Sequence, residues 1–215
     1  MKVRKRRSRT LQTDEKIKRM DEAFINKAKD MVVLSGKDLT LSNGDVNPLN
    51  LPKYWNRDYI HERIELVSNL RHKMLMQFLW FTGCRITEAV SVQKKQINFK
   101  DYVITIRWQK NKKYLYRNIP MHPTLKNMME IYTAPMLTEE LIFPITRQRA
   151  WQLVKKYFEG HPHQFRHSFA VNWLRCGGEL VLLSRMLGHA NVQSTMEYLK
   201  IVPIDQGKEL MKIEF

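Results

Sequence analysis

The stretch that decides the fold reads His163-Gln164-Phe165-Arg166-His167, then Leu187-Gly188-His189, then Thr195-Met196-Glu197-Tyr198. It gathers an arginine, three histidines and a tyrosine in one short region. None of the spacings suits a metal site, but each of these side chains can work on a phosphate. Arginine makes permanently charged two-point contacts, histidine exchanges protons near neutral pH, and tyrosine can attack as a nucleophile.

The residues around this stretch predict its first helix. Pro162 suits the first helical position because it has no N–H to lose there, and Gly177-Gly178 suits the end. His163, Arg166 and His167 then share one face through their i, i+3 and i+4 spacing. The opposite, apolar stripe is expected in the core and consists of Phe165, Phe169, Trp173 and Cys176.

Two further helices are predicted downstream. An apolar helix runs from about 179 to 187 and ends at Gly188, which His189 follows. Asn191 can cap a third helix, which places Tyr198 about two turns in. A lone His or Tyr on a helix is usually structural, so this string needs an arginine and a lysine upstream to complete a phosphate site.

Composition points to a polyanionic partner. The chain has 215 residues, a formal net charge of +16 and a pI near 9.9, which favours nucleic acid. Cys84 and Cys176 fit neither a disulfide framework nor a zinc site, so a reducing interior is expected. No apolar segment of a secretory signal or membrane span is present. We therefore expect a cytoplasmic protein on double-stranded DNA, with no membrane partner.

Along the chain, residues 1–54 are predicted to form a basic arm, a helix over 14–31 and a linker over 35–54, and residues 55–215 a structured domain. Alternating residues at 102–108 and 114–119 predict two strands around the turn Lys110-Asn111-Lys112-Lys113. Residues 141–144 read as a short apolar strand or loop. Helical periodicity covers 58–67, 70–81, 86–91, 124–132 and 147–158. The expected class is α+β with a dominant α part.

Three short sequence motifs, which follow one another along the chain, resemble the motifs or boxes of the tyrosine recombinases, the phage integrase family. Residues 82–88, Thr-Gly-Cys-Arg-Ile-Thr-Glu, resemble the first arginine box of that family. Residues 161–170 resemble its HxxR box, and residues 187–198 its last box, which ends in the nucleophile. The likeness covers roughly 55–199 and implies a tyrosine-recombinase catalytic domain with a small antiparallel hairpin.

The resemblance implies a role for each matched side chain. Tyr198 would attack the scissile phosphate and leave a 3′-phosphotyrosine and a 5′-hydroxyl. Arg85 and Arg166 would hold the phosphate oxygens. His163 would accept the tyrosine proton, and His189 would hydrogen-bond the transition state. In addition, Glu88 is expected to order the arginine turn, Cys84 to pack, and His167 either to support the catalytic residues from behind or to be structural. No cofactor and no metal are expected.

The lysine that would protonate the leaving 5′-oxygen has two candidates. Lys110 begins the hairpin turn and precedes Asn111, as the family pattern prefers. Lys112 fits better when residues are counted back from Pro120. Lys110 is favoured, and Lys112 stays the alternative.

The resemblance also implies partners. Family members work as tetramers on DNA, so a homotetramer on DNA is expected, and a monomer or weak oligomer without it. The 54 residues before the catalytic part resemble the short inverting recombinases, which have little or no N-terminal core-binding domain; a full integrase with a reduced arm is the alternative. The tail after Tyr198 would dock on a neighbour or pack on its own core. DNA-binding candidates are Arg147, Arg149, Lys155 and Lys156.

The function implied is site-specific recombination through a Holliday junction, with integration, excision, inversion or resolution as outcomes. Two alternatives stay open. A type IB topoisomerase uses the same residue types to relax DNA without specific sites. A DNA-binding protein that has lost catalysis is the other, and Arg85, Arg166, His189 and Tyr198 together argue against it.

Overall fold

The computed structural model describes residues 52–110 and 113–202, and all of them belong to one unit of the chain, Val46–Phe215. The predicted arm, helix and linker before residue 52, the tail beyond Val202 and Lys112 lie outside the described residues, so the domain boundary after residue 54 stays a prediction. The elements are α2 (Arg57–Glu65), α3 (Leu70–Thr82), α4 (Ile86–Ala89), η1 (Lys94–Gln96), β1 (Ile97–Asn98), β2 (Val103–Lys110), β3 (Lys113–Pro120), α5 (Pro123–Thr133), α6 (Arg147–Phe158), α7 (Pro162–Arg175), α8 (Leu180–Leu187), α9 (Gln193–Met196) and η2 (Glu197–Lys200).

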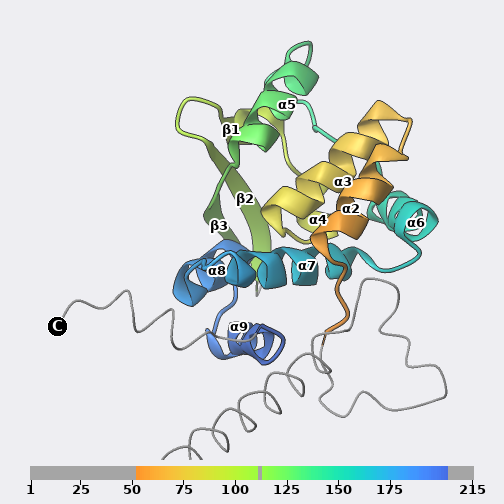
Figure 1. The fold of residues 1–215 in the computed structure, drawn as a ribbon. Helices are drawn as coiled ribbons and strands as arrows, with labels where there is room; N and C mark the ends of the chain where they lie inside the picture. Colours follow the sequence, from red (N-terminus) through yellow and green to blue (C-terminus); the bar gives the residue numbers. More distant parts are fainter. Residues whose placement is uncertain (1–51, 111–112, 203–215) are drawn as a thin grey trace, which may run out of the picture. The chain divides into compact units, whose positions relative to one another are not determined.

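The sheet is a small antiparallel one in the order β1-β2-β3 (Figure 1). Its register pairs Ile104 with both Ile97 and Ile119, so that apolar residues meet on its inner face. The long hairpin of β2 and β3 contacts α4 and α8 through its two strands. The predicted α+β class with dominant helices is confirmed, and both strands run closer to the turn than their alternation indicated.

The main core surrounds α3, whose C-terminal two thirds are mostly apolar and buried from Met74 onward. Leu75, Phe78 and Leu79 have no exposed surface, and Phe78 meets Phe143 edge-on with ring centroids 5.4 Å apart. Burying each such side chain contributes about 1.5–3 kcal/mol. The buried part of α3 is covered by several neighbours, and α2, α5 and α7 each contact it.

A second, smaller cluster joins α7, α8 and η2. Its buried members are Ala170, Val171, Leu183, Met186, Leu187, Tyr198 and Val202. Tyr198 is therefore one of the buried apolar positions of the fold, with 4% of its surface exposed.

Trp55 ties the first described residues to both α6 and α7. Its backbone N–H donates to Ser168 Oγ at 2.7 Å, and its ring lies 5.1 Å from both Phe158 and Phe165. Phe158 and Phe165 meet edge-on at 4.6 Å. The chain thus enters this domain directly beside the HxxR helix.

Most predicted helix limits are confirmed within one to three residues, because they depend on local signals. Pro162 begins α7, Arg147 begins α6, and Gly188 ends α8 with a left-handed φ of 67°. The prediction that Cys176 lies in the core is wrong. It is exposed, because α7 ends at Arg175 and the chain turns outward at Gly177. None of the described helices combines the length and apolar character that crossing a membrane requires.

Gly83 gives a stability prediction. It ends α3 with φ 58°, and a Cβ built there lies 2.5 Å from Phe169 Cδ1. Gly83→Ala should lower the free energy of unfolding by about 2–4 kcal/mol, from backbone strain plus overpacking. Gly177→Ala is the matched control, since φ is 80° but nothing lies within 4 Å of its Cβ; about 1 kcal/mol is expected. Urea denaturation measures both, and equal losses would contradict a clash with Phe169.

Candidate active site

A groove of about 660 Å³ lies between α4, the β2–β3 hairpin and the turn after α8. The residues that line it are Arg85, Thr87, Glu88, Ser91, Arg107, Trp108, Tyr114, Gly188, His189, Ala190 and Ser194. Two of the predicted catalytic residues, Arg85 and His189, therefore face the same groove from opposite walls.

The arginine turn is ordered by Glu88, as predicted. The Glu88 carboxylate accepts the backbone N–H of Arg85 at 2.7 Å and Arg85 Nη1 at 3.0 Å. The side chain of Arg85 is 37% exposed, so part of its guanidinium remains open to the groove. Burial would raise the pKa of Glu88, but its contacts with Arg117 and Arg85 outweigh this and lower it. Glu88 is thus a buried, charged support for Arg85.

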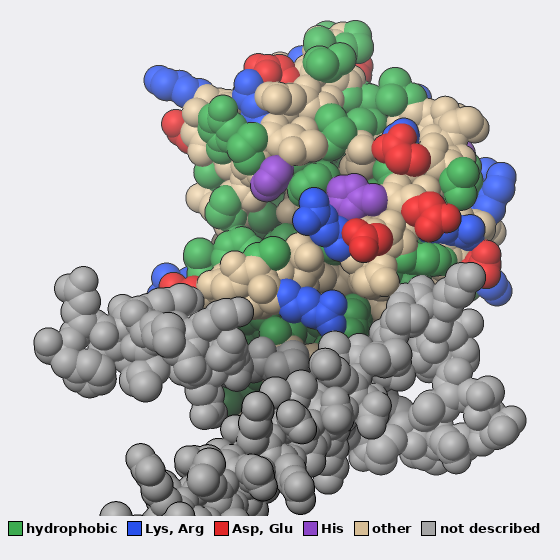
Figure 2. All heavy atoms as spheres, viewed as in Figure 1, with side chains coloured by type: hydrophobic (Ala, Val, Ile, Leu, Met, Phe, Trp, Pro, Cys, Tyr) green, Lys and Arg blue, Asp and Glu red, His purple; other side chains and the backbone are tan. Residues whose placement is uncertain are grey.

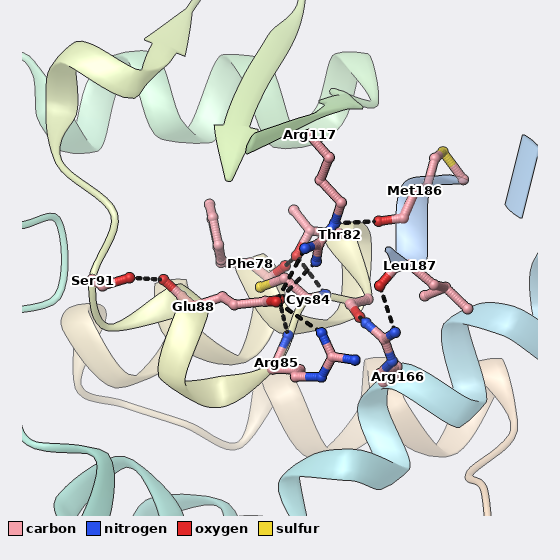
Figure 3. Close-up of polar contacts among 11 residues, drawn as sticks. Phe78, Thr82, Cys84, Arg85, Glu88, Ser91, Arg117, Arg166, Met186 and Leu187 are labelled. Atoms are coloured by element: carbon pink, nitrogen blue, oxygen red, sulfur yellow. Dashed lines mark hydrogen bonds and ion pairs between the residues drawn. The ribbon is translucent and has the colours of Figure 1, made fainter. Parts of the chain in front are cut away.

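Two arginines occupy the end of α8, whose last carbonyls have no partner within the helix. Arg166 Nη2 donates to Leu187 O at 2.5 Å, and its Nη1 donates to Gly83 O at 3.0 Å. Arg117 Nε donates to Met186 O at 2.7 Å (Figure 3). Burial and the neighbouring Arg85 lower the pKa of Arg166 to about 10, which leaves it charged at neutral pH.

Tyr198 lies on η2 and its hydroxyl is hydrogen-bonded to His167 Nδ1 at 2.9 Å. Burial raises the pKa of Tyr198, and Arg166 opposes this. Burial, followed by the charges of His163 and Arg166, lowers the pKa of His167 to about 4. A neutral His167 can therefore accept a hydrogen bond from the tyrosine hydroxyl. Tyr198 is not among the residues that line the groove, and its hydroxyl is bonded to His167.

The other two histidines differ in position. His163 lies on the first turn of α7, with its ring 6.3 Å from that of His167. Burial, then Arg166 and Arg85, lower its pKa. His189 Nδ1 is hydrogen-bonded to Thr195 Oγ1 at 2.8 Å, and burial followed by Arg166 and Arg85 lowers the pKa of His189 to about 4. The structure brings His167, rather than His163, to the tyrosine hydroxyl.

The predicted DNA-binding residues are all exposed, but they do not form one surface. Arg147 lies on the same face of α6 as Trp151 and Lys155, and its charge acts on His163. Arg149 and Lys156 act instead on His72, whose pKa is lowered by burial and then by these two charges. The four side chains therefore divide between a side of α6 near the site and a side near the start of α3.

The positive charge is spread over the domain. Residues 52–202 contain 23 Lys and Arg and 11 Asp and Glu. Figure 2 shows both signs interspersed with apolar side chains on one face, instead of a continuous basic surface. Within the described ranges, no three His, Cys, Asp or Glu side chains gather in a way that could hold a metal ion.

Three site features were missed or left open by the sequence. Arg117 was not singled out, although it occupies an inward-facing position between Leu115 and Ile119 on a strand, where a charge is unusual. His167 was expected to support the site or to be structural, and only the packing of η2 on α7 shows that it contacts the Tyr198 hydroxyl. The backbone of Lys110 ends β2, but its side chain is outside what the structure describes.

Comparison with known proteins agrees with the geometry. A model described as the phage integrase family matches residues 58–203. The chain belongs to the phage integrase family. Among curated members, it is 30% identical over 169 residues to the tyrosine recombinase XerA of Pyrococcus horikoshii, covering 72% of this chain and 59% of the relative. It is 26% identical over 181 residues to XerD of Pasteurella multocida, covering 72% and 60%. The chain thus spans about three fifths of these relatives.

Solved structures of phage integrase family members and related recombinases share the fold. The crystal structure of XerA recombinase has a TM-score of 0.62 and 21% identity, covering 80% of this chain and 66% of the other. The catalytic domain of bacteriophage HP1 integrase has a TM-score of 0.59 and 19% identity, covering 74% of this chain and 93% of that domain. The resemblance to this family and the expected fold are therefore confirmed.

Acidification should destabilise this integrase-family domain. His72, His163, His167 and His189 have folded-state pKa values below 6.5, so between those values and 6.5 the unfolded chain binds more protons. The free energy of unfolding should therefore fall as pH drops from 6.5 to 5, a window that ends above the range where carboxylates titrate. Urea denaturation across this window measures the slope. His167→Gln should flatten it, and a slope unchanged by that substitution would contradict a neutral, buried His167.

Proposed function

We propose that this protein is a site-specific DNA recombinase that cuts and rejoins DNA through a 3′-phosphotyrosine and a Holliday junction. The observation that carries the proposal is the convergence of three boxes, in a chain of the phage integrase family, on one groove. Arg85 and His189 line the groove. Arg166 donates hydrogen bonds to the backbone just before each of these segments, at Gly83 O and Leu187 O, and Tyr198 is packed on the adjoining helices. Its substrate places it on DNA in the cytoplasm, and no cofactor is required.

In the proposed reaction, Tyr198 Oη attacks the scissile phosphorus and the bond to the 5′-oxygen breaks. The tyrosine proton passes to a histidine, for which His167 has the contact and His163 is the family-based candidate. Arg85 and Arg166 neutralise the non-bridging oxygens, which their planar guanidinium groups suit. A Thr195 hydroxyl that donates to His189 Nδ1 leaves Nε2–H free to donate to the phosphate.

The second half of the reaction forms a new phosphodiester bond and breaks the bond between phosphorus and Tyr198. A 5′-hydroxyl from the partner duplex attacks the phosphotyrosine, and Tyr198 leaves with its proton restored. One phosphodiester is exchanged for another through the tyrosyl ester, so no net energy input is needed. We propose a homotetramer as the form that holds two duplexes, with Arg147, Lys155 and the basic residues of the hairpin as contacts to DNA phosphates.

The test is a covalent trapping assay. A pool of nicked duplexes with randomised sequence around the nick is incubated with the protein, and adducts that survive denaturation are recovered and sequenced. Adducts on one enriched sequence, followed by strand exchange between two copies of it, are expected. Adducts without sequence preference, together with relaxation of a supercoiled plasmid, would indicate the topoisomerase alternative. Sequence-specific binding without any adduct would indicate a DNA-binding protein that has lost catalysis.

The general acid should be found at Lys110. A duplex with a 5′-bridging sulfur at the scissile phosphate has a thiolate leaving group that needs no proton. Lys110→Ala is expected to be slow on ordinary DNA and near wild type on the sulfur substrate. Lys112→Ala should show no such rescue and should lower the salt dependence of binding by about one unit of slope, as for a lost phosphate contact. The reverse pattern would transfer the role to Lys112.

A further inference from the structure

Arg117 is a buried charge that the proposed reaction does not use. It lies on β3, with 8% of its surface exposed, and its side chain makes ionic, polar and aromatic-ring contacts. Its Nη1 and Nη2 donate to the two oxygens of Glu88 at 3.0 and 2.7 Å, and its Nε donates to Met186 O at 2.7 Å. Its guanidinium also lies 5.1 Å from the centre of the Trp108 ring.

The sheet itself has no need of an arginine at this position. Arg117 pairs with Ile106, and the neighbouring pair on the same face is Ile104 with Ile119. An apolar side chain would fill this position without the desolvation cost of a buried ion pair. The reason for the charge therefore lies in what Arg117 holds.

One of its partners is the carboxylate that supports Arg85. Glu88 Oε1 accepts from both Arg85 Nη1 and Arg117 Nη1, and Oε2 accepts from both the Arg85 backbone N–H and Arg117 Nη2. Figure 3 shows Glu88 between the two arginines. Because Arg117 grips both oxygens, it fixes the plane of the carboxylate, and that plane fixes Arg85.

Arg117 also contacts the end of α8, which leads into the other side of the groove. Arg117 holds the end of α8 at Met186 O, and it packs against the turn that follows. A Cβ on Gly188 would lie 3.0–3.2 Å from Nη1, Cδ and Cζ of Arg117, so the arginine packs closely against this turn. His189 comes directly after this turn and lines the groove.

We propose that Arg117 is a positioning residue, which sets the distance between Arg85 on one wall of the groove and His189 on the other. The proposal rests on the proposed function, because its effect is on phosphate cleavage. Misplacing a reacting or charge-stabilising group by about 1 Å costs on the order of 10²-fold in rate.

The experiment measures single-turnover adduct formation at saturating protein. Arg117→Met should lower this rate on the order of 100-fold, and DNA affinity, measured in the Tyr198→Phe background, should stay within roughly threefold. A duplex with a neutral methylphosphonate at the scissile position removes the charge that Arg85 neutralises. On that duplex the defect of Arg117→Met should shrink to about tenfold or less, as for a variant of Arg85 itself.

Arg63 supplies a matched control. It makes the same kinds of contact, from Nε to Tyr157 O at 2.6 Å and from Nη2 to Glu159 Oε1 at 2.9 Å, between α2 and α6 and outside the groove. Arg63→Met should cleave both substrates within about twofold of the wild-type rate, because it removes a structural tether only.

Two further variants keep the test decisive. If Arg117→Met does not fold because Glu88 is left unpaired, the double variant Glu88→Gln/Arg117→Met removes both charges and should fold but stay slow. Arg117→Lys keeps the charge and loses the two-point grip, so it should also be slow. Wild-type cleavage by either variant would overturn the proposal.

Amide hydrogen exchange separates this proposal from the proposed function. The Arg85 N–H donates to Glu88, so it should exchange about tenfold faster, relative to the amides of α3, in the double variant than in Arg63→Met. Equal protection of Arg85 would refute the positioning role, whatever the activity. If the Arg85 amide exchanges faster in the double variant but the wild-type protein forms no adduct with any duplex, only the proposed function is refuted.

Discussion

Replacement of Tyr198 by phenylalanine should abolish the covalent DNA adduct and leave DNA affinity within about twofold. Only the hydroxyl is lost, and the hydroxyl is the nucleophile. The phenylalanine ring keeps the packing of Tyr198 among Val171, Leu183 and Leu187, because the side chain is 96% buried by apolar neighbours and only its hydroxyl is bonded, to His167. Stability should change by about 1 kcal/mol or less, the worth of one hydrogen bond.

Tyr54→Phe is the control for this substitution. Tyr54 packs against the same cluster and its hydroxyl accepts a hydrogen bond from Arg175 at 2.9 Å, outside the groove. Its adduct yield should equal that of wild type on a denaturing gel. An adduct of undiminished yield in Tyr198→Phe would mean that another side chain is the nucleophile.

Arg85→Lys should lower the rate of adduct formation by about 10²–10³-fold. An ammonium group cannot make the planar two-point contact of a guanidinium. The effect should appear in the rate at saturating protein. The fold should survive, because the side chain is 37% exposed and the backbone N–H still donates to Glu88.

Arg63→Lys serves as the matched change outside the groove, with a rate within about twofold of wild type. Methylphosphonate at the scissile position should relieve the Arg85→Lys defect and leave Arg63→Lys unaffected. Cleavage by Arg85→Lys within a few-fold of wild type would make Arg85 a groove contact rather than a phosphate clamp.

The sequence predicted the elements well because each limit has a local cause. Pro162, Gly83 and Gly188 mark helix ends through their own backbone preferences, and the alternation around Ile104 and Ile119 marks the hairpin. The order of the three boxes predicted that Arg85, Arg166, His189 and Tyr198 would come together. No local sequence pattern, however, specifies the distances between these four side chains.

What the sequence missed depends on contacts between distant segments. Arg117 and Met186 are 69 residues apart, and the strand pattern around Arg117 shows only that its side chain points inward. The contact of His167 with Tyr198 depends on how η2 packs on α7. The third helix was expected to be continuous to Tyr198, but α9 ends at Met196 and the chain tightens into the 3-10 helix η2. The N-cap residue of α9 is Val192 and not the predicted Asn191, whose Oδ1 instead accepts the Gln193 N–H at 2.9 Å in the turn before the helix.

The two four-residue helices α9 and η2, the second of which carries Tyr198, set catalytic activity against thermal stability. Neither α9 nor η2 is long enough to persist alone, so both are held by burial of Thr195 and Tyr198 against α7 and α8. Because the Tyr198 hydroxyl is bonded to His167, we expect attack on a phosphate in the groove to require this segment to open locally, and the observed rate is then multiplied by the open fraction. A substitution that fills this cluster more tightly would raise the melting temperature and slow the enzyme, so directed evolution for speed should loosen it first.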